Sequence, residues 1–336
     1  MKKVFIMCIF TVIIISSGLV YFNIQTGPYD SSKDKQVLVD IKKGSSLNSV
    51  SDTLFEKQLI KNKLFFKIIA KINKMDTGIK AGLYNLNQSY SNKEILDMLN
   101  SGSVYKDLVK VTIPEGFEAH QIADRLSNLG LVDKEKFMDL VNTPSVFRDK
   151  YSFLNQEYIV SLEGYLFPDT YFVNKNYSEK DIINMLLNRF DQMYTDEYKK
   201  IQNEKNLTLN QVITLASIVE REARLDKERS IIAGVFYNRM NINMPLQSCA
   251  TVQYILGERK PNLSFEDIKI DSPYNTYKNA GLPPGPIASP GKKSIEAALY
   301  PEDVDYLYFV AKKDGSHSFS KTYNEHLKRK GENESE

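Results

Sequence analysis

The feature of this sequence that most limits its fold is an internal repeat with an offset of 72 residues. The segment Ile41-Lys-Lys-Gly44 returns as Ile113-Pro-Glu-Gly116. Further matches in the same register are Val50 with Ile122, Asp52 with Asp124, Leu54 with Leu126, Leu59-Ile60 with Leu131-Val132, and Phe65 with Phe137. Each copy has the pattern of a short strand, a glycine turn, an amphipathic helix and the start of a second helix. The sequence therefore predicts two diverged copies of one small α/β unit, with chance similarity as the alternative.

The stretch between the two copies completes the first as a small α+β unit. Residues 81–86 alternate like a strand, and Ser91 with Glu94 has the pattern of a capping box at the start of a helix. A strand, two helices and a returning strand resemble the LysM-like peptidoglycan-binding module, here over residues 37–108. Many small α+β units share this order, so the order alone does not identify the module.

The amino-terminal end has the pattern of a membrane anchor. Residues 4–22 carry no charge, and a run of this length can cross a bilayer as a helix. Lys2 and Lys3 precede the run, which predicts that residues 1–3 stay in the cytoplasm and that the remaining chain is exported. A cleaved signal peptide is the alternative, but an A-x-A-like cleavage site is missing. We expect a single-pass anchor in the cytoplasmic membrane, with the rest of the chain on the extracytoplasmic side.

Charge and cysteine content narrow the possible functions. The chain has 44 basic and 42 acidic residues, and without Lys2 and Lys3 the two classes balance at 42 each. A balanced chain lacks the basic surface of a nucleic-acid-binding protein. Cys8 lies in the predicted span and Cys249 is the other cysteine, so the exported part cannot form an internal disulfide. Burial of apolar side chains must therefore stabilise it.

Two glutamates lie in an apolar segment that predicts a helix over residues 209–224. At about 100° per residue, Glu220 and Glu222 fall at opposite edges of the apolar face. Partial burial favours the neutral form of a carboxyl group, which suits a general acid. The alternative is a solvated Glu220 paired with Arg224 one turn later. The helical wheel alone does not choose between the two glutamates.

A loop rich in proline and glycine, residues 272–291, is the second unusual segment. It is far too long for a simple connection, and loops of this kind are often functional. Tyr274, Asn275, Thr276 and Tyr277 supply hydrogen-bonding and stacking groups of the kind that sugars need. The alternative is a surface loop stiffened for stability.

Other chemistries find no support in the sequence. His317 and His326 lack a third ligand at the spacing of a zinc site, so we expect no metal. The sequence also lacks a nucleophile elbow, a P-loop and a dinucleotide fingerprint, so we expect no cofactor. Carboxylate chemistry is the class that remains.

Seven strings, in order along the chain, resemble those of the YceG-like endolytic murein transglycosylases (the MltG family). They are LEGYLFPDTY, TLASIVEREA, VFYNRMNINMPLQ, TVQYILG, SPYNTYKNAGLPPGPIASPG, LYFVA and HSFSKTYNEH. The family carries its catalytic glutamate in the ASIVE string, which implies Glu220 and implies that Glu222→Gln retains activity. The matched strings also imply substrate-binding roles for Glu163, Tyr165, Gln247, Thr251, Gln253, Tyr274, Asn275, Thr276 and Tyr277. Cys249 departs from the family, whose members usually carry aspartate there, and this puts any role of that carboxylate in doubt.

The resemblance implies a lyase that cuts peptidoglycan glycan strands without water. Glu220 would protonate the glycosidic oxygen between N-acetylmuramic acid and N-acetylglucosamine. The resulting carboxylate would then deprotonate the muramyl C6 hydroxyl, which closes a 1,6-anhydro ring. The enzymatic alternative is a muramidase-type hydrolase with Glu163 or Asp169 as a second carboxylate. The non-enzymatic alternative is a membrane-tethered peptidoglycan-binding scaffold.

The same resemblance implies an anchored enzyme that ends nascent glycan strands beside a peptidoglycan synthase. The expected fold class is α+β, with an amino-terminal transmembrane helix, a LysM-like module and an α+β catalytic domain. The expected limits are 1–3 (cytoplasmic tip), 4–22 (anchor), 23–36 (linker), 37–108 (LysM-like module), 109–160 (second repeat unit), 161–330 (catalytic domain) and 331–336 (tail).

Overall fold

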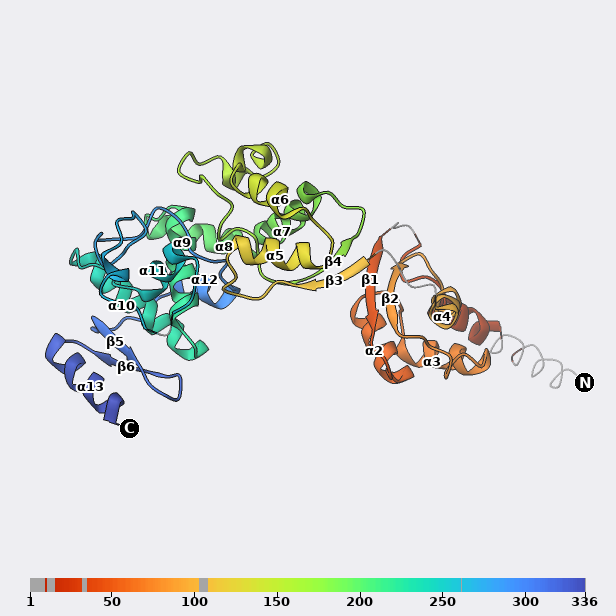
Figure 1. The fold of residues 1–336 in the computed structure, drawn as a ribbon. Coiled ribbons are helices and arrows are strands. Elements are labelled where there is room, and N and C mark those ends of the chain that lie inside the picture. Colours follow the sequence, from red (N-terminus) through yellow and green to blue (C-terminus); the bar gives the residue numbers. More distant parts are fainter. Residues whose placement is uncertain (1–9, 11–15, 32–34, 103–107, 261, 336) are drawn as a thin grey trace, which may run out of the picture. The chain divides into compact units, whose positions relative to one another are not determined.

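A computed structural model describes residues 10, 16–31, 35–102, 108–260 and 262–335 (Figure 1). Most of the predicted membrane span lies outside these ranges, while residues 16–26 are helical. Within the described ranges, none of the helices combines the length and the apolar character needed to cross a membrane. The chain divides into two compact units, Met1–Leu108 and Val109–Glu336.

The first unit is a small α+β fold built on one antiparallel strand pair. Its elements in order are β1 (Gln36–Ile41), α2 (Leu47–Glu56), α3 (Lys63–Ile72), β2 (Gly82–Asn87) and α4 (Asn92–Ser101). In the pair, Val39 lies opposite Tyr84, and both side chains belong to the buried core. The predicted order of strand, two helices and strand is the order found. The capping box of Ser91 and Glu94 begins α4 as expected.

The same order of elements returns at the start of the second unit. Here β3 (Leu108–Thr112), α5 (Ala119–Asn128), α6 (Lys134–Val141), β4 (Thr170–Asn174) and α7 (Glu179–Met193) follow one another, and β3 pairs with β4. The first helices of the two copies begin 72 residues apart and have equal length. The repeat is therefore confirmed in secondary structure. The second copy differs by a long insertion before β4, which contains the 3₁₀ turns η1 (Pro144–Phe147) and η2 (Ser152–Leu154).

One residue pairing in the repeat needs correction. Phe66, and not Phe65, is the fully buried aromatic of α3, whereas Phe137 is buried in α6. The reason is that α3 and α6 begin 71 residues apart, so the connection before α3 is one residue longer. The counterpart of Phe137 is therefore Phe66.

The rest of the second unit is mainly helical and shares one hydrophobic core with the second copy. Its elements are α8 (Asp196–Glu204), α9 (Leu209–Glu222), η3 (Asp226–Glu228), α10 (Arg229–Asn241), α11 (Cys249–Leu256), η4 (Asp267–Lys269), α12 (Lys292–Leu299), β5 (Tyr308–Ala311), β6 (His317–Ser320) and α13 (Tyr323–Ser335). Helix α9 packs against α8, α10, α11 and α12. The antiparallel β5–β6 hairpin packs against α13 (Figure 1).

These elements confirm the predicted α+β class, with two-stranded sheets among many helices. The carboxyl-terminal end differs from expectation. Helix α13 runs to Ser335, so most of the charged segment predicted as a tail from residue 331 is helical.

Candidate functional site

Helix α9 carries the two candidate glutamates in its last turn. Its start is fixed by a capping box between Thr208 and Gln211, and residues 212–219 are all buried. The helix ends at Glu222. Because positions two apart on a helix are separated by about 200°, Glu220 and Glu222 point to different sides.

The ion pair between Glu220 and Arg224, the alternative interpretation of the sequence, is not the pair found. Ala223 has an extended backbone, with φ −77° and ψ 121°, so Arg224 does not lie one helical turn beyond Glu220. Arg224 is exposed and packs against Gly315. The cation that pairs with Glu220 is Arg229, from the start of α10.

Glu220 is buried in a network of hydrogen-bond donors. Its Oε1 lies 3.1 Å from Nη1 of Arg229, and its Oε2 accepts from the Gly291 backbone N–H at 3.0 Å and from the Ser294 hydroxyl at 2.8 Å. Arg229 also donates to the Ser294 hydroxyl at 2.6 Å. The side chain of Glu220 is 6% exposed and that of Arg229 is 9% exposed. These three donors occupy both oxygens of Glu220 and join the end of α9 to the starts of α10 and α12.

A second carboxylate, Glu115, lies on the Glu220 side. A Cβ atom on Gly291 would meet Glu115 Oε1 at 2.0 Å, so only glycine fits there with the side chains as they lie. Burial raises the pKa of Glu115, and the negative charge of Glu220 raises it further. In the sequence analysis Glu115 is only part of the repeat, and its position beside Glu220 was not predicted. Asp169 lies elsewhere, paired with Arg189 at 2.6 Å.

Glu222 lines a cavity of about 390 Å³ on its own side of α9. The Ser248 hydroxyl donates to Glu222 Oε1. The other residues that line this Glu222 cavity are Arg239, Leu246, Gln247, Cys249, Tyr277, Tyr308, Phe309, Ala311, His317, Tyr323 and His326. Glu222 is the one carboxylate among these lining residues, and the cavity offers aromatic rings and polar groups around it. This composition suits a sugar ligand.

The predicted substrate-binding residues separate into three groups. Gln247 and Tyr277 line the Glu222 cavity, where the Tyr277 hydroxyl lies 3.0 Å from Cys249 Sγ. Glu163 and Tyr274 line a second hollow of about 370 Å³. In that hollow Glu163 accepts from the backbone N–H of Ala119, and burial raises its pKa to about 8.

The remaining predicted residues support the fold rather than line the Glu222 cavity. Thr251 and Thr276 are buried and lie 2.9 Å apart between their hydroxyls. The Asn275 amide donates to the carbonyls of residues 268 and 270, and the Gln253 amide donates to that of residue 260. Tyr165 is fully buried and bonds to Asn210. These side chains hold the loop over residues 272–291 and its neighbours in place.

Five polar residues of the Glu222 cavity were not predicted as site residues from the sequence. They are Arg239, Tyr308, His317, Tyr323 and His326. All lie in or beside strings that carry the family resemblance, and this was the available signal. The histidines were weighed only as metal ligands, although His317 Nδ1 lies 2.7 Å from the carboxylate of Glu228.

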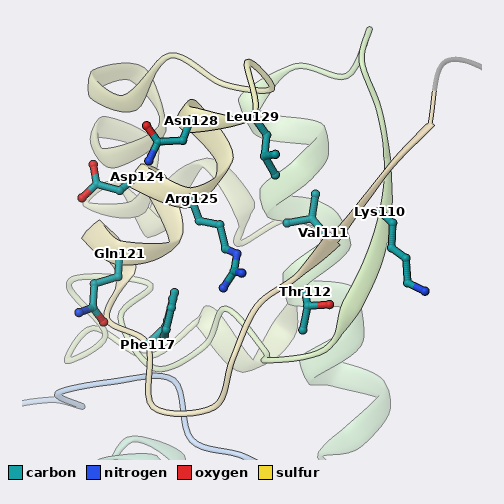
Figure 2. A pocket seen from close by; sticks show the side chains of 9 residues that line it. All are labelled: Lys110, Val111, Thr112, Phe117, Gln121, Asp124, Arg125, Asn128 and Leu129. Carbon is teal, nitrogen blue, oxygen red and sulfur yellow. The ribbon is translucent and has the colours of Figure 1, made fainter.

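A larger hollow of about 730 Å³ lies between β3 and α5 (Figure 2). Arg125 points from α5 towards it, with its guanidinium 5.6 Å from the centre of the Phe117 ring. Asp124 also lines it and pairs with Lys134. None of its lining residues comes from α9 or from the 272–291 loop. The candidate site is therefore not assigned to this hollow, although it is the larger one.

The sequence profile of the YceG-like family matches residues 39–332. The chain belongs to the YceG-like family. Two relatives are each named endolytic murein transglycosylase. That of Bacillus subtilis (strain 168) is 35% identical over 328 residues, which cover 95% of this chain and 90% of the relative. That of Streptococcus pneumoniae serotype 2 (strain D39 / NCTC 7466) is 37% identical over 308 residues, which cover 84% of this chain and 56% of the relative.

A solved structure agrees with the family assignment. The crystal structure at 2.6 Å of a protein described as YceG-like, from Listeria monocytogenes, superposes with a TM-score of 0.61. Its sequence is 36% identical, and the match covers 88% of this chain and all of that one. The YceG-like fold is therefore shared over nearly the whole described chain.

Proposed function

We propose that this YceG-like protein is an endolytic peptidoglycan lytic transglycosylase. It cleaves the bond between N-acetylmuramic acid and N-acetylglucosamine and leaves 1,6-anhydromuramyl ends. The observation that carries the proposal is Glu222, the one carboxylate lining a cavity with aromatic and polar walls. The names of the two relatives support the same activity.

The geometry favours Glu222 as the general acid, and we move the proposal from Glu220 to it. Glu220 is held by Arg229, Gly291 and Ser294, and these donors occupy both of its oxygens. Glu222 is bonded to Ser248 and faces space that a glycan can fill. A general acid must reach the leaving oxygen, and Glu222 has that access. Glu220 is assigned instead to holding the ends of α9, α10 and α12 together.

The reaction needs only one carboxyl group. Glu222 protonates the glycosidic oxygen as positive charge develops at the muramyl C1. The bond between C1 and that oxygen breaks, and the C6 hydroxyl oxygen attacks C1 while its proton passes to a base. The Glu222 carboxylate left by the first step can act as this base. Hydrolases of the usual kind need a second carboxyl group about 5–9.5 Å away, and among the described residues that line the Glu222 cavity Glu222 is the one carboxylate.

The muramidase-type hydrolase is retained as the second candidate because of one observation. Glu115 and Glu220 are two carboxyl groups close enough to affect each other's charge. If Glu220 were the acid, Glu115 would be the second carboxylate, in place of Glu163 or Asp169. The Glu220 side chain is 6% exposed beside Arg229, which speaks against it as the acid, whereas Glu115 is exposed.

The context of the enzyme is also part of the proposal. We infer a single-pass membrane anchor over residues 4–22 and an extracytoplasmic catalytic domain, on the basis of the uncharged run behind two lysines. The order β1, α2, α3 and β2 supports a LysM-like module in the first unit. An anchored enzyme of this kind would act on nascent strands beside a synthase.

The test is digestion of purified sacculi by the full chain in detergent, followed by mass spectrometry of the products. The proposal predicts anhydromuramyl ends. Reducing muramic acid ends would replace it by the hydrolase. Binding to sacculi with no cleavage would replace it by the peptidoglycan-binding scaffold.

A further inference from the structure

Helix α3 has a strip of apolar side chains that faces away from the core of the first unit. Phe66 and Ala70 point into that core. On the opposite side Leu64, Ile68 and Ile72 recur every four residues, and these three residues form the α3 strip. Leu64 is 59% exposed and Ile72 is 66% exposed, with Ile68 half-buried between them. A contiguous apolar strip on a surface indicates a place that an apolar partner covers.

Lysines line one edge of the α3 strip. At about 100° per residue, Lys63, Lys67 and Lys71 fall next to one another on the helix. Lys63 pairs with Asp52 at 2.7 Å. Lys67 donates to the side-chain oxygen of Asn48 at 3.2 Å, and Lys71 is exposed to solvent. An apolar strip with a basic edge is typical of helices that lie on anionic membranes.

The first turn of α3 contacts the end of the proposed membrane anchor. The Phe65 ring packs edge to face on the rings of Tyr21 and Phe22, with centroids 5.7 Å and 5.6 Å apart. Tyr21 and Phe22 belong to the helical stretch 16–26 and are the last two residues of the uncharged run. If residues 4–22 cross the bilayer as proposed, these two rings lie at its extracytoplasmic interface. Phe65 then lies at the same depth.

The α3 strip lies between this aromatic contact and the lysines. Around the axis of the helix the residues follow in the order Lys67, Leu64, Ile68, Ile72 and Phe65. The anchor contact therefore borders the strip on one side, and the lysines border it on the other. A helix in this position can bury its apolar strip in the bilayer surface while the long lysine side chains reach the headgroups.

We propose that α3 docks on the anionic surface of the membrane that holds the anchor. The α3 strip enters the boundary between headgroups and acyl chains, and Lys67 and Lys71 face anionic headgroups. A bilayer fits this surface better than another protein, because the strip continues from the interface rings of Tyr21 and Phe22 and has a basic edge. The inference rests on the proposed anchor and is independent of the reaction proposed at α9.

The full chain in nanodiscs tests the docking directly. In a background of Cys8→Ser and Cys249→Ser, Ile72→Cys carries one environment-sensitive fluorophore. Ile72 lies about two turns beyond Phe65, so contact of this label with lipid does not follow from the anchor alone. We expect its emission to shift to the blue in discs of phosphatidylcholine and phosphatidylglycerol, and to be lost when the lipids carry a quencher on the acyl chain.

A label on the opposite face of the first unit is the control. Asn85 follows the buried Tyr84 in β2, and alternate residues of a strand point to opposite faces. The label of Asn85→Cys therefore points away from the helices that pack on Tyr84. We expect its emission to be the same in discs with and without the quencher.

Two variants with the same net charge test the lysines. Lys67→Gln combined with Lys71→Gln removes two basic groups beside the α3 strip. Each lysine near an anionic leaflet shifts the docking equilibrium about fivefold, so the ratio of docked to undocked α3 should fall by about 25-fold. Lys199→Gln combined with Lys200→Gln, on α8 of the second unit, is the matched control and should leave the quenching of the Ile72→Cys label unchanged.

The outcomes separate the docking from the proposals before it. If alkaline carbonate extracts the full chain from vesicles of the same lipids, the anchor is wrong and the docking falls with it. If the chain stays in the bilayer and the Ile72→Cys label is not quenched, the docking alone is wrong. A label shielded from water but not reached by the lipid quencher would mean that protein covers the α3 strip. Quenching that survives Lys67→Gln with Lys71→Gln would overturn the role of anionic lipid. None of these measurements depends on cleavage of sacculi.

Discussion

The last turn of α9 carries two carboxylates, and the surroundings on its two sides differ. On one side Glu220 is enclosed by Arg229, Gly291 and Ser294, with Glu115 next to it. On the other side Glu222 has a serine partner and opens onto a cavity. Two glutamates in one helical turn thus have different surroundings, and on this difference we base the proposed roles of the two residues.

This comparison teaches that burial of an acid is not enough to make it a catalyst. A buried carboxylate with several donors is stabilised in its charged form, whereas a general acid must hold and then release a proton at a reachable place. Burial without hydrogen-bond donors raises the pKa of a carboxyl group. Hydrogen-bond donors around a buried carboxylate act in the opposite direction and lower it. The access given by the cavity is the reason why we propose Glu222.

The largest expected effect is loss of activity in Glu222→Gln. The amide keeps the shape and can still bond to Ser248, but it cannot donate a proton to the glycosidic oxygen. Release of soluble fragments from sacculi should fall by about 10²- to 10⁴-fold, with the unfolding temperature nearly unchanged. Wild-type activity in Glu222→Gln would show that Glu222 is not the general acid.

The next effect is loss of stability in Glu220→Gln. This change removes the buried carboxylate partner of Arg229 and leaves it only the more exposed Asp226 at 3.1 Å, and breaking a buried pair costs up to about 3–5 kcal/mol. Urea unfolding followed by circular dichroism measures it. The matched control is Glu220→Gln combined with Arg229→Met, which should recover part of the loss because no buried charge is left unpaired. A single variant as stable as the wild type would contradict the structural role.

Glu163 is a third acid for this comparison, and the hydrogen-bond donor to its carboxyl group is a backbone N–H rather than an arginine. Burial raises its pKa to about 8 in the folded protein, against 4.5 when unfolded. The folded state therefore binds the proton more tightly, so this stabilising contribution is complete below about pH 4.5 and is lost as the pH rises through about 8. Stability should fall by on the order of a few kcal/mol between pH 5 and pH 9, and Glu163→Gln should reduce that fall. An equal fall in both proteins, measured by urea unfolding at several pH values, would contradict the raised pKa.

The smallest expected effect concerns Cys249, which lines the cavity beside Glu222. Aspartate at this position would place a second negative charge in the cavity and favour the protonated form of its neighbour. We expect Cys249→Asp to change the rate at neutral pH by less than about tenfold and to move the alkaline limb of the pH–rate profile to higher pH. Cys249→Ser is the uncharged control and should leave that limb in place. If the alkaline limb of the pH–rate profile does not move in Cys249→Asp, a charge at position 249 does not affect the protonation of Glu222.

Local patterns predicted much of the fold. The first strand and the first two helices of both copies follow from hydrophobic spacing, glycine turns and caps such as Ser91, which act within a few residues, whereas the returning strand β4 was not predicted. The register slip at Phe66 was missed because one extra loop residue leaves little trace in a periodic pattern. The alternative pairing of Glu220 with Arg224 is not found because the helix ends at Glu222 and the backbone of Ala223 is extended, which a periodic pattern does not reveal.

The candidate site was less predictable because it is assembled from distant segments. The Glu222 cavity combines α9, the residues around Gln247, the β5–β6 hairpin and α13. A helical wheel places Glu220 and Glu222 at equivalent edges and contains no information on which tertiary neighbour covers each one. The motif strings marked the right segments, and only the tertiary contacts separate the residues that line the cavity from those, such as Asn275, that hold the loop.

The most direct test of the central claim compares Glu220→Gln and Glu222→Gln in one digestion of sacculi by the full chain. Both proteins are assayed at a temperature where each is shown to be folded, and anhydromuramyl ends are counted by mass spectrometry. We predict that Glu220→Gln still produces these ends and that Glu222→Gln does not. Anhydromuramyl ends from Glu222→Gln, together with their absence from folded Glu220→Gln, would contradict the account and return the general acid to Glu220.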